Sequence, residues 1–86
     1  MMDPIIKICG LSTPETLDAA LDAGADWVGF AHFPRSPRHV DLETGHSLSV
    51  RARGRARRVV LLVDPEDSAL AAVVAALDPD LLQLHG

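Results

Sequence analysis

The chain has 86 residues and a formal net charge of −4, which suits one small domain with a modest core. The acidic balance disfavours a dedicated binder of nucleic acid or anionic membranes. A single cysteine excludes an internal disulfide framework and fits a reducing compartment. No apolar run reaches the roughly 18 residues of a membrane span, and the start lacks the features of a signal peptide. We therefore expect a cytoplasmic protein that binds neither nucleic acid nor membrane.

The first third of the chain alternates strand and helix signals. A β-branched run predicts a strand near residues 5–9. Thr13 then suits a helix N-cap and Pro14 the first helical position, while Gly24 stands where that helix ends. A second strand is predicted near residues 27–32.

Two prolines three positions apart, Pro34 and Pro37, exclude a regular helix or central strand and predict a loop of fixed shape. The loop carries Arg35 and Arg38. It is either a solvated surface loop or a pre-shaped grip for a carboxylate or phosphate.

The rest of the chain continues the alternation. Asp41 is the expected N-cap of a helix over residues 42–53. The apolar run 59–63 predicts a strand buried on both faces. Residues 64–67 repeat the opening signal of the first helix, and after that third helix a last strand is predicted near residues 81–85.

The element order is thus βαβαβαβ over residues 1–86, read as one α/β domain with about 25 residues per unit. Strands separated by helices of this length pair in parallel. The order fits either a small open sheet or the first half of a (β/α)8 barrel, truncated after the fourth strand. In both architectures ligands bind at the carboxyl ends of the strands.

Polar side chains stand where the first strand ends. Lys7 and Cys9 share one strand face, and Gly10 follows. Cys9 is either a small buried hydrophobe or a base or nucleophile. The second interpretation needs a thiolate, which positive charge favours, and Lys7 lies on the same face.

The last strand carries a similar pattern. Gln83 and His85 share one face and lie just before the final glycine. They are either satisfied by neighbours or contact a substrate, and histidine exchanges protons readily near neutral pH. The four histidines show no metal-ligand spacing, and one cysteine cannot complete a zinc site, so no metal or cofactor is expected.

The one basic run contains Arg51, Arg53, Arg55, Arg57 and Arg58. No aromatic residue is interleaved with it, so a nucleic-acid site is disfavoured. We expect a solvated helix end, where cations complement the helix dipole.

Four segments carry a further pattern in order along the chain: residues 7–10 (Lys-Ile-Cys-Gly), 23–30 (Ala-Gly-Ala-Asp-Trp-Val-Gly-Phe), 34–38 (Pro-Arg-Ser-Pro-Arg) and 82–86 (Leu-Gln-Leu-His-Gly). Together they resemble phosphoribosylanthranilate isomerase, a family of tryptophan-biosynthesis enzymes. The sequence departs from the family's pattern at His32 and Phe33, which usually are two aromatics, and at Trp27, which replaces a smaller residue.

The resemblance implies a (β/α)8 barrel that performs an Amadori rearrangement of a phosphosugar without metal or organic cofactor. An acid opens the ribose ring to a Schiff base, and a base removes the proton of the neighbouring carbon. The enolamine then tautomerises to the ketone. The resemblance assigns the base to Cys9, contact with the anthranilate carboxylate to Arg38, and pocket-lining roles to Gln83 and His85.

The resemblance also implies that much of such an enzyme lies outside this sequence. The family's general acid is an aspartate on a later strand, and its phosphate site comes from the last two strands. We therefore expect an N-terminal portion whose isolated 86 residues are inactive. The alternatives are a half-barrel that associates with another chain through its open sheet edges, and another phosphosugar-binding barrel enzyme.

Overall fold

The computed structural model describes residues 4–85, in which four strands alternate with three helices. The strands are β1 (Lys7–Ile8), β2 (Trp27–Ala31), β3 (Arg57–Val63) and β4 (Leu81–His85). The helices are α1 (Pro14–Asp22), α2 (Leu42–Ala52) and α3 (Asp67–Leu77). The predicted element order is confirmed.

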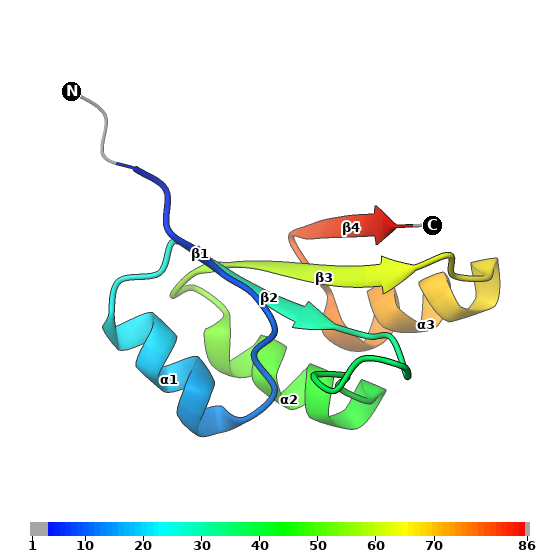
Figure 1. Ribbon diagram of the computed structural model, residues 1–86, viewed down its shortest axis with the longest axis horizontal. Coiled ribbons are helices and arrows are strands. Elements are labelled where there is room, and N and C mark those ends of the chain that lie inside the picture. The colour runs from blue at the N-terminus through cyan, green and yellow to red at the C-terminus, as the bar shows by residue number, and fades with distance from the viewer. Residues whose placement is uncertain (1–3, 86) are drawn as a thin grey trace.

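The strands form one parallel sheet in the order β1-β2-β3-β4, so β1 and β4 are its two edges. All three helices lie on the same side of this sheet, and the other side carries no helix (Figure 1). Such a one-sided arrangement leaves the second sheet face open over the described residues.

Strand alternation sorts the side chains between these two faces. Val28, Phe30, Val60 and Leu62 point toward the helices and are almost completely buried. Together with apolar residues of the three helices they form the core. The residues that alternate with them lie on the open face, where Trp27 pairs in register with Lys7 and with Arg57.

The first two helix starts follow the sequence signals. The Thr13 hydroxyl accepts the backbone N–H of Thr16 at 3.1 Å, and Pro14 occupies the first turn. Asp41 accepts the N–H of Thr44 at 2.7 Å through its carboxylate, which lowers the pKa of Asp41.

The third helix begins differently from the prediction. Its N-cap is Glu66, which makes no side-chain capping bond, and Asp64 adopts a left-handed φ of 43°. The N–H of Asp64 bonds the carbonyl of His85, so this residue still belongs to the β3–β4 ladder. Residues 64–66 connect β3 to α3, and the helix starts only at Asp67.

Two strand lengths also differ from the prediction. β1 pairs with β2 at only two residues, Lys7 and Ile8, and not over the predicted residues 5–9. The chain turns at Gly10, soon after this pair. β3 begins two residues before the predicted Val59. Its exposed end at Val63 shows that β3 is not buried on both faces throughout.

The basic run is only partly a solvated helix end. Arg51, Arg53 and Arg55 are exposed and pair with aspartates. Arg58, in contrast, is buried. Its guanidinium donates to the Ser49 hydroxyl at 2.9 Å and to the Asp80 carboxylate at 3.3 Å, so the expectation of a solvated face is wrong for this arginine.

Candidate active site

Cys9 directly follows β1, at the carboxyl end of the sheet, and its side chain is exposed. The interpretation as a buried hydrophobe is therefore wrong. A Cβ added to Gly29 of the neighbouring strand would lie 3.0 Å from Cys9 Sγ and 3.2 Å from Cys9 Cα. The missing side chain at Gly29 thus lets the end of β1 lie close against β2.

Gly10 makes room for Arg38 in the same way. Its φ is +77°, which glycine adopts without strain, and an added Cβ would lie 2.5 Å from Arg38 Cδ. The aliphatic part of Arg38 therefore lies across Gly10, one residue after Cys9. Cys9 and Arg38, which are far apart in the sequence, both line the same pocket.

The proline loop is held at both ends. Val40 N–H donates to the carbonyl of Ala31 at 2.8 Å, and the His32 ring donates from Nδ1 to the carbonyl of Val40 at 2.8 Å. Within the loop, the Ser36 hydroxyl accepts the backbone N–H of Arg38 at 3.1 Å. These bonds fix the position of Arg38, as the prediction of a rigid loop requires.

Cys9, Arg38 and Gln83 meet around one pocket of about 190 Å³ whose floor is formed by Val59 and Leu61 of β3. Ligand sites usually measure roughly 300–1,000 Å³. The smaller volume fits a site of which these residues supply one wall. The apolar floor with polar groups at the rim suits a ligand that has both an aromatic and a charged part.

The open face also carries a bond between the two edges of the sheet. Lys7 Nζ of β1 donates to Gln83 Oε1 of β4 at 3.0 Å, and Gln83 Nε2 lies 3.2 Å from His85 Nε2. In the strand register, Gln83 lies four residues further along the sheet than Lys7, a distance of about 13 Å along the strands. Three strand spacings also separate β1 from β4. Because a flat sheet would hold them too far apart, the sheet must curl around its open face, as the wall of a barrel does.

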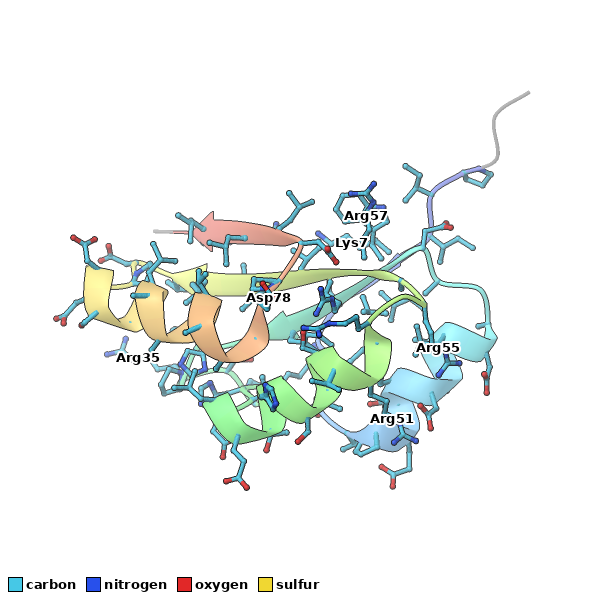
Figure 2. All side chains as sticks on the ribbon, turned by 180° about the vertical axis from the view of Figure 1, so that it is seen from behind. Lys7, Arg35, Arg51, Arg55, Arg57 and Asp78 are labelled. Carbon is cyan, nitrogen blue, oxygen red and sulfur yellow. The ribbon has the colours of Figure 1, made fainter. Side chains whose placement is uncertain are left out.

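The two arginines of the loop lie in different places. Both are exposed, but only Arg38 lines the pocket. Figure 2 places Arg35 on the helix side of the sheet, and Lys7 and Arg57 on the opposite, open side. Only Arg38 is therefore positioned for the anion-gripping alternative.

Three features that shape this site were not predicted: the roles of Gly29 and Ser36, and the contact between Lys7 and Gln83. An isolated glycine inside a strand is a signal of close backbone approach, and Ser36 before a proline is typical of a turn. No local signal could reveal that Lys7 contacts Gln83, because the bond depends on the curvature of the whole sheet.

The chemistry available in the pocket is that of a thiol, a fixed cation and an amide around an apolar floor. The predicted site residue His85 does not line this pocket, but its imidazole contacts the Gln83 amide. Among the described residues no cluster of three or more potential metal-ligating side chains is present. Within residues 4–85, none of the helices has the length and apolar character that crossing a bilayer requires.

A family model described as N-(5'-phosphoribosyl)anthranilate isomerase matches residues 6–86. The chain belongs to this isomerase family. The resemblance seen in the four sequence segments is thereby confirmed.

Curated N-(5'-phosphoribosyl)anthranilate isomerases match almost the whole chain. The protein from Azorhizobium caulinodans is 67% identical over 81 residues, which are 94% of this chain and 36% of the relative. The protein from Bradyrhizobium sp. (strain ORS 278) is 59% identical over 85 residues, or 99% of this chain and 39% of the relative. The chain thus spans less than two fifths of these relatives.

Solved isomerase structures superimpose closely. The Thermotoga maritima phosphoribosylanthranilate isomerase gives a TM-score of 0.89 at 31% identity, covering 98% of this chain and 42% of that protein. TrpF from Jonesia denitrificans gives 0.88 at 32% identity, covering 98% and 41%. A phosphoribosylanthranilate isomerase bound to reduced 1-(o-carboxyphenylamino)-1-deoxyribulose 5-phosphate gives 0.90 at 31% identity, covering 98% and 43%. The prediction of half a (β/α)8 barrel is confirmed.

Proposed function

We propose that the protein carrying this chain isomerises N-(5'-phosphoribosyl)anthranilate, an Amadori rearrangement in tryptophan biosynthesis. The observation that carries this proposal is the meeting of Cys9, Arg38 and Gln83 around one pocket at the carboxyl ends of the strands. A relative of the same fold binds a reduced form of a carboxyphenylamino-deoxyribulose phosphate, which supports a phosphosugar ligand. This support favours the isomerase over another phosphosugar-binding barrel enzyme.

In this proposal Cys9 is the general base. The exposed thiol faces the pocket beside the apolar floor, where a thiolate can take the proton from the carbon next to the Schiff base. The acid that opens the ribose ring comes from another part of the barrel. No cofactor enters the reaction, because proton transfers alone convert substrate to product.

Arg38 binds the anthranilate carboxylate. Its guanidinium group is the charged group of the pocket, and its backbone and side chain are fixed by Ser36 and Gly10. Gln83 lines the same pocket and His85 bonds to it, so we assign both to the substrate-facing wall.

We infer that residues 1–86 form the first part of a single barrel domain, completed by further polypeptide of the same protein. The relatives are more than twice as long as the matched region. We further propose a cytoplasmic location, which fits a biosynthetic enzyme with one exposed free thiol.

Substitution of Cys9 by Ser tests the proposed base in the full-length protein. Serine keeps the size of the side chain but is a far weaker base, so we expect kcat to fall by about 10²–10⁴-fold with little change in the melting temperature. Steady-state turnover of phosphoribosylanthranilate measures the loss. Undiminished turnover by the variant would remove Cys9 from the mechanism, and turnover by the isolated 86 residues would refute the need for an acid elsewhere.

Substitutions of Arg38 and Arg35 give a matched test of the proposed contact with the anthranilate carboxylate. We expect Arg38→Ala to raise KM by about 10–100-fold, since a charge-assisted bond to the substrate is lost. Arg35→Ala, in the same loop but outside the pocket, is expected to change KM less than two-fold. Equal effects of the two substitutions would assign the loop a merely structural role.

A half-barrel that associates through its edges is the second candidate. β4 is an edge strand, and its Leu81, Leu82 and Leu84 are exposed, as is Ile5 before β1. Size-exclusion chromatography of the isolated 86-residue chain tests this candidate: it predicts a concentration-dependent dimer, and Leu84→Lys should then restore the monomer. A monomer at every concentration would exclude it.

A further inference from the structure

The hydrogen bond between Lys7 and Gln83 determines how the polar side chains of β4 are oriented. Lys7 has no role in the function proposed above, yet its Nζ lies 3.0 Å from Gln83 Oε1 on the open face of the sheet. Gln83 is half-buried, and its Nε2 lies 3.2 Å from Nε2 of His85. The three side chains therefore form one continuous chain of hydrogen bonds.

The direction of this chain follows from the donors available. A lysine ammonium has three donors and no acceptor, so only the oxygen of the Gln83 amide can face Lys7. The orientation of a glutamine amide is otherwise open, since its oxygen and nitrogen are nearly isosteric. Lys7 removes that freedom, and the NH₂ group of Gln83 must face His85.

The same reasoning determines which nitrogen of the His85 ring carries the proton. The NH₂ group of Gln83 only donates, so Nε2 of His85 must accept and carries no proton. The proton of the neutral ring then lies on Nδ1. A free histidine side chain favours the opposite tautomer, with the proton on Nε2, so the protein must enforce this state.

We propose that Lys7 is a positioning residue that orients the Gln83 amide and thereby holds His85 in its Nδ1–H tautomer. His85 consequently offers a bound ligand a hydrogen-bond donor, because its acceptor nitrogen is already engaged by Gln83. For the isomerase substrate, which rests on the function proposed above, that donor suits a phosphosugar hydroxyl or carbonyl oxygen. The tautomer itself does not depend on which substrate binds.

The test is two-bond ¹H–¹⁵N correlation spectroscopy of the full-length protein, at a pH where the same spectra show His85 neutral. The His85 ring signals are assigned by their loss in His85→Asn. We expect the Nδ1–H pattern in the native protein and in Lys7→Arg, which keeps a donor-only cation. Lys7→Met should lose this preference and give a mixture that contains the Nε2–H form.

Two further variants separate this role from general effects. Arg57→Met removes a cation from the same sheet face and the same register level without touching Gln83, and should leave the Nδ1–H pattern unchanged. Gln83→Glu places a carboxylate between Lys7 and His85. Since a carboxylate only accepts, His85 must then protonate Nε2, and the pattern should reverse.

An Nε2–H ring in the native protein would overturn the proposal, as would an unchanged ring in Lys7→Met or in Gln83→Glu. If Lys7→Met does not fold, Lys7→Gln decides the outcome, because its amide can both donate and accept and so should also give a mixture of tautomers. These readings are independent of turnover. Loss of the isomerase assignment would therefore leave the positioning role intact, and failure of the positioning role would leave the isomerase assignment intact.

Discussion

At the scale of single residues, two glycines decide where the reactive groups lie. Gly29 has no side chain where one would press on the sulfur of Cys9, and Gly10 leaves the space that Arg38 fills. The geometry of the candidate site therefore depends on atoms that are absent as much as on the named functional groups. This dependence can be measured in the full-length protein.

We expect Gly29→Ala to lower kcat/KM by at least about ten-fold, because a methyl group 3.0 Å from Cys9 Sγ must push the thiol away. Overpacking of this kind costs roughly 1–3 kcal/mol of unfolding free energy. Gly24→Ala is the matched control. Its φ of +89° strains an alanine, but nothing lies within 4 Å of the added Cβ, so stability should fall without loss of activity. Equal activity losses would mean that stability alone explains the effect.

At the scale of elements, the three helix starts differ in how well they are capped. α2 follows the site loop, and its N-cap Asp41 accepts the N–H of Thr44, whereas the N-cap of α3, Glu66, makes no such bond. The end of the loop that carries Arg38 is thus fixed to a capped helix. Asp41 and Glu66 therefore allow a direct comparison between an N-cap that makes a side-chain capping bond and one that does not.

Asp41→Ala should lower the unfolding free energy measurably, since a helix N–H loses its acceptor. Glu66→Ala should change it by less than about 0.5 kcal/mol, because no capping bond is lost. Urea unfolding of both variants gives the comparison. Similar losses in the two variants would show that the Asp41 bond contributes little.

At the scale of the whole molecule, one buried arginine joins three elements. Arg58 of β3 bonds Ser49 of α2 and Asp80 of the turn before β4, and the backbone N–H of Arg58 donates to the same carboxylate at 2.8 Å. This backbone bond, with the guanidinium charge adding to it, lowers the pKa of Asp80 below its usual 3.8. The network therefore couples the packing of the helices to the position of β4.

Asp80→Asn should lower the unfolding free energy by up to about 1 kcal/mol at neutral pH, since the buried guanidinium loses its counter-charge, although water screens the carboxylate, which is 37% exposed. The folded pKa of Asp80 lies below its unfolded value, so the stabilisation is fully present above about pH 3.8 and is lost as the pH falls through the folded pKa. The difference between native and variant protein in urea unfolding should thus shrink below pH 3.8. Asp78→Asn, which breaks only an exposed pair with Arg53, should be nearly neutral. A pH-independent difference for Asp80 would contradict the assigned cause.

Local sequence was sufficient for the element order, for the caps at Thr13 and Asp41, and for β4, because hydrophobic periodicity and capping act over a few neighbouring residues. It also identified Cys9 and Arg38 as candidates, because strand ends and proline loops are where parallel sheets place functional groups.

Only the tertiary structure decided that Cys9 is exposed and lies beside Gly29, that Arg58 is buried, and that Lys7 reaches Gln83. Each of these depends on strand register and on the curl of the sheet. Register and curl arise from the packing of every strand and helix together, so no segment of the sequence encodes them alone. For this reason the sequence named the reactive groups of the site, while the fold set the contacts that give them their positions.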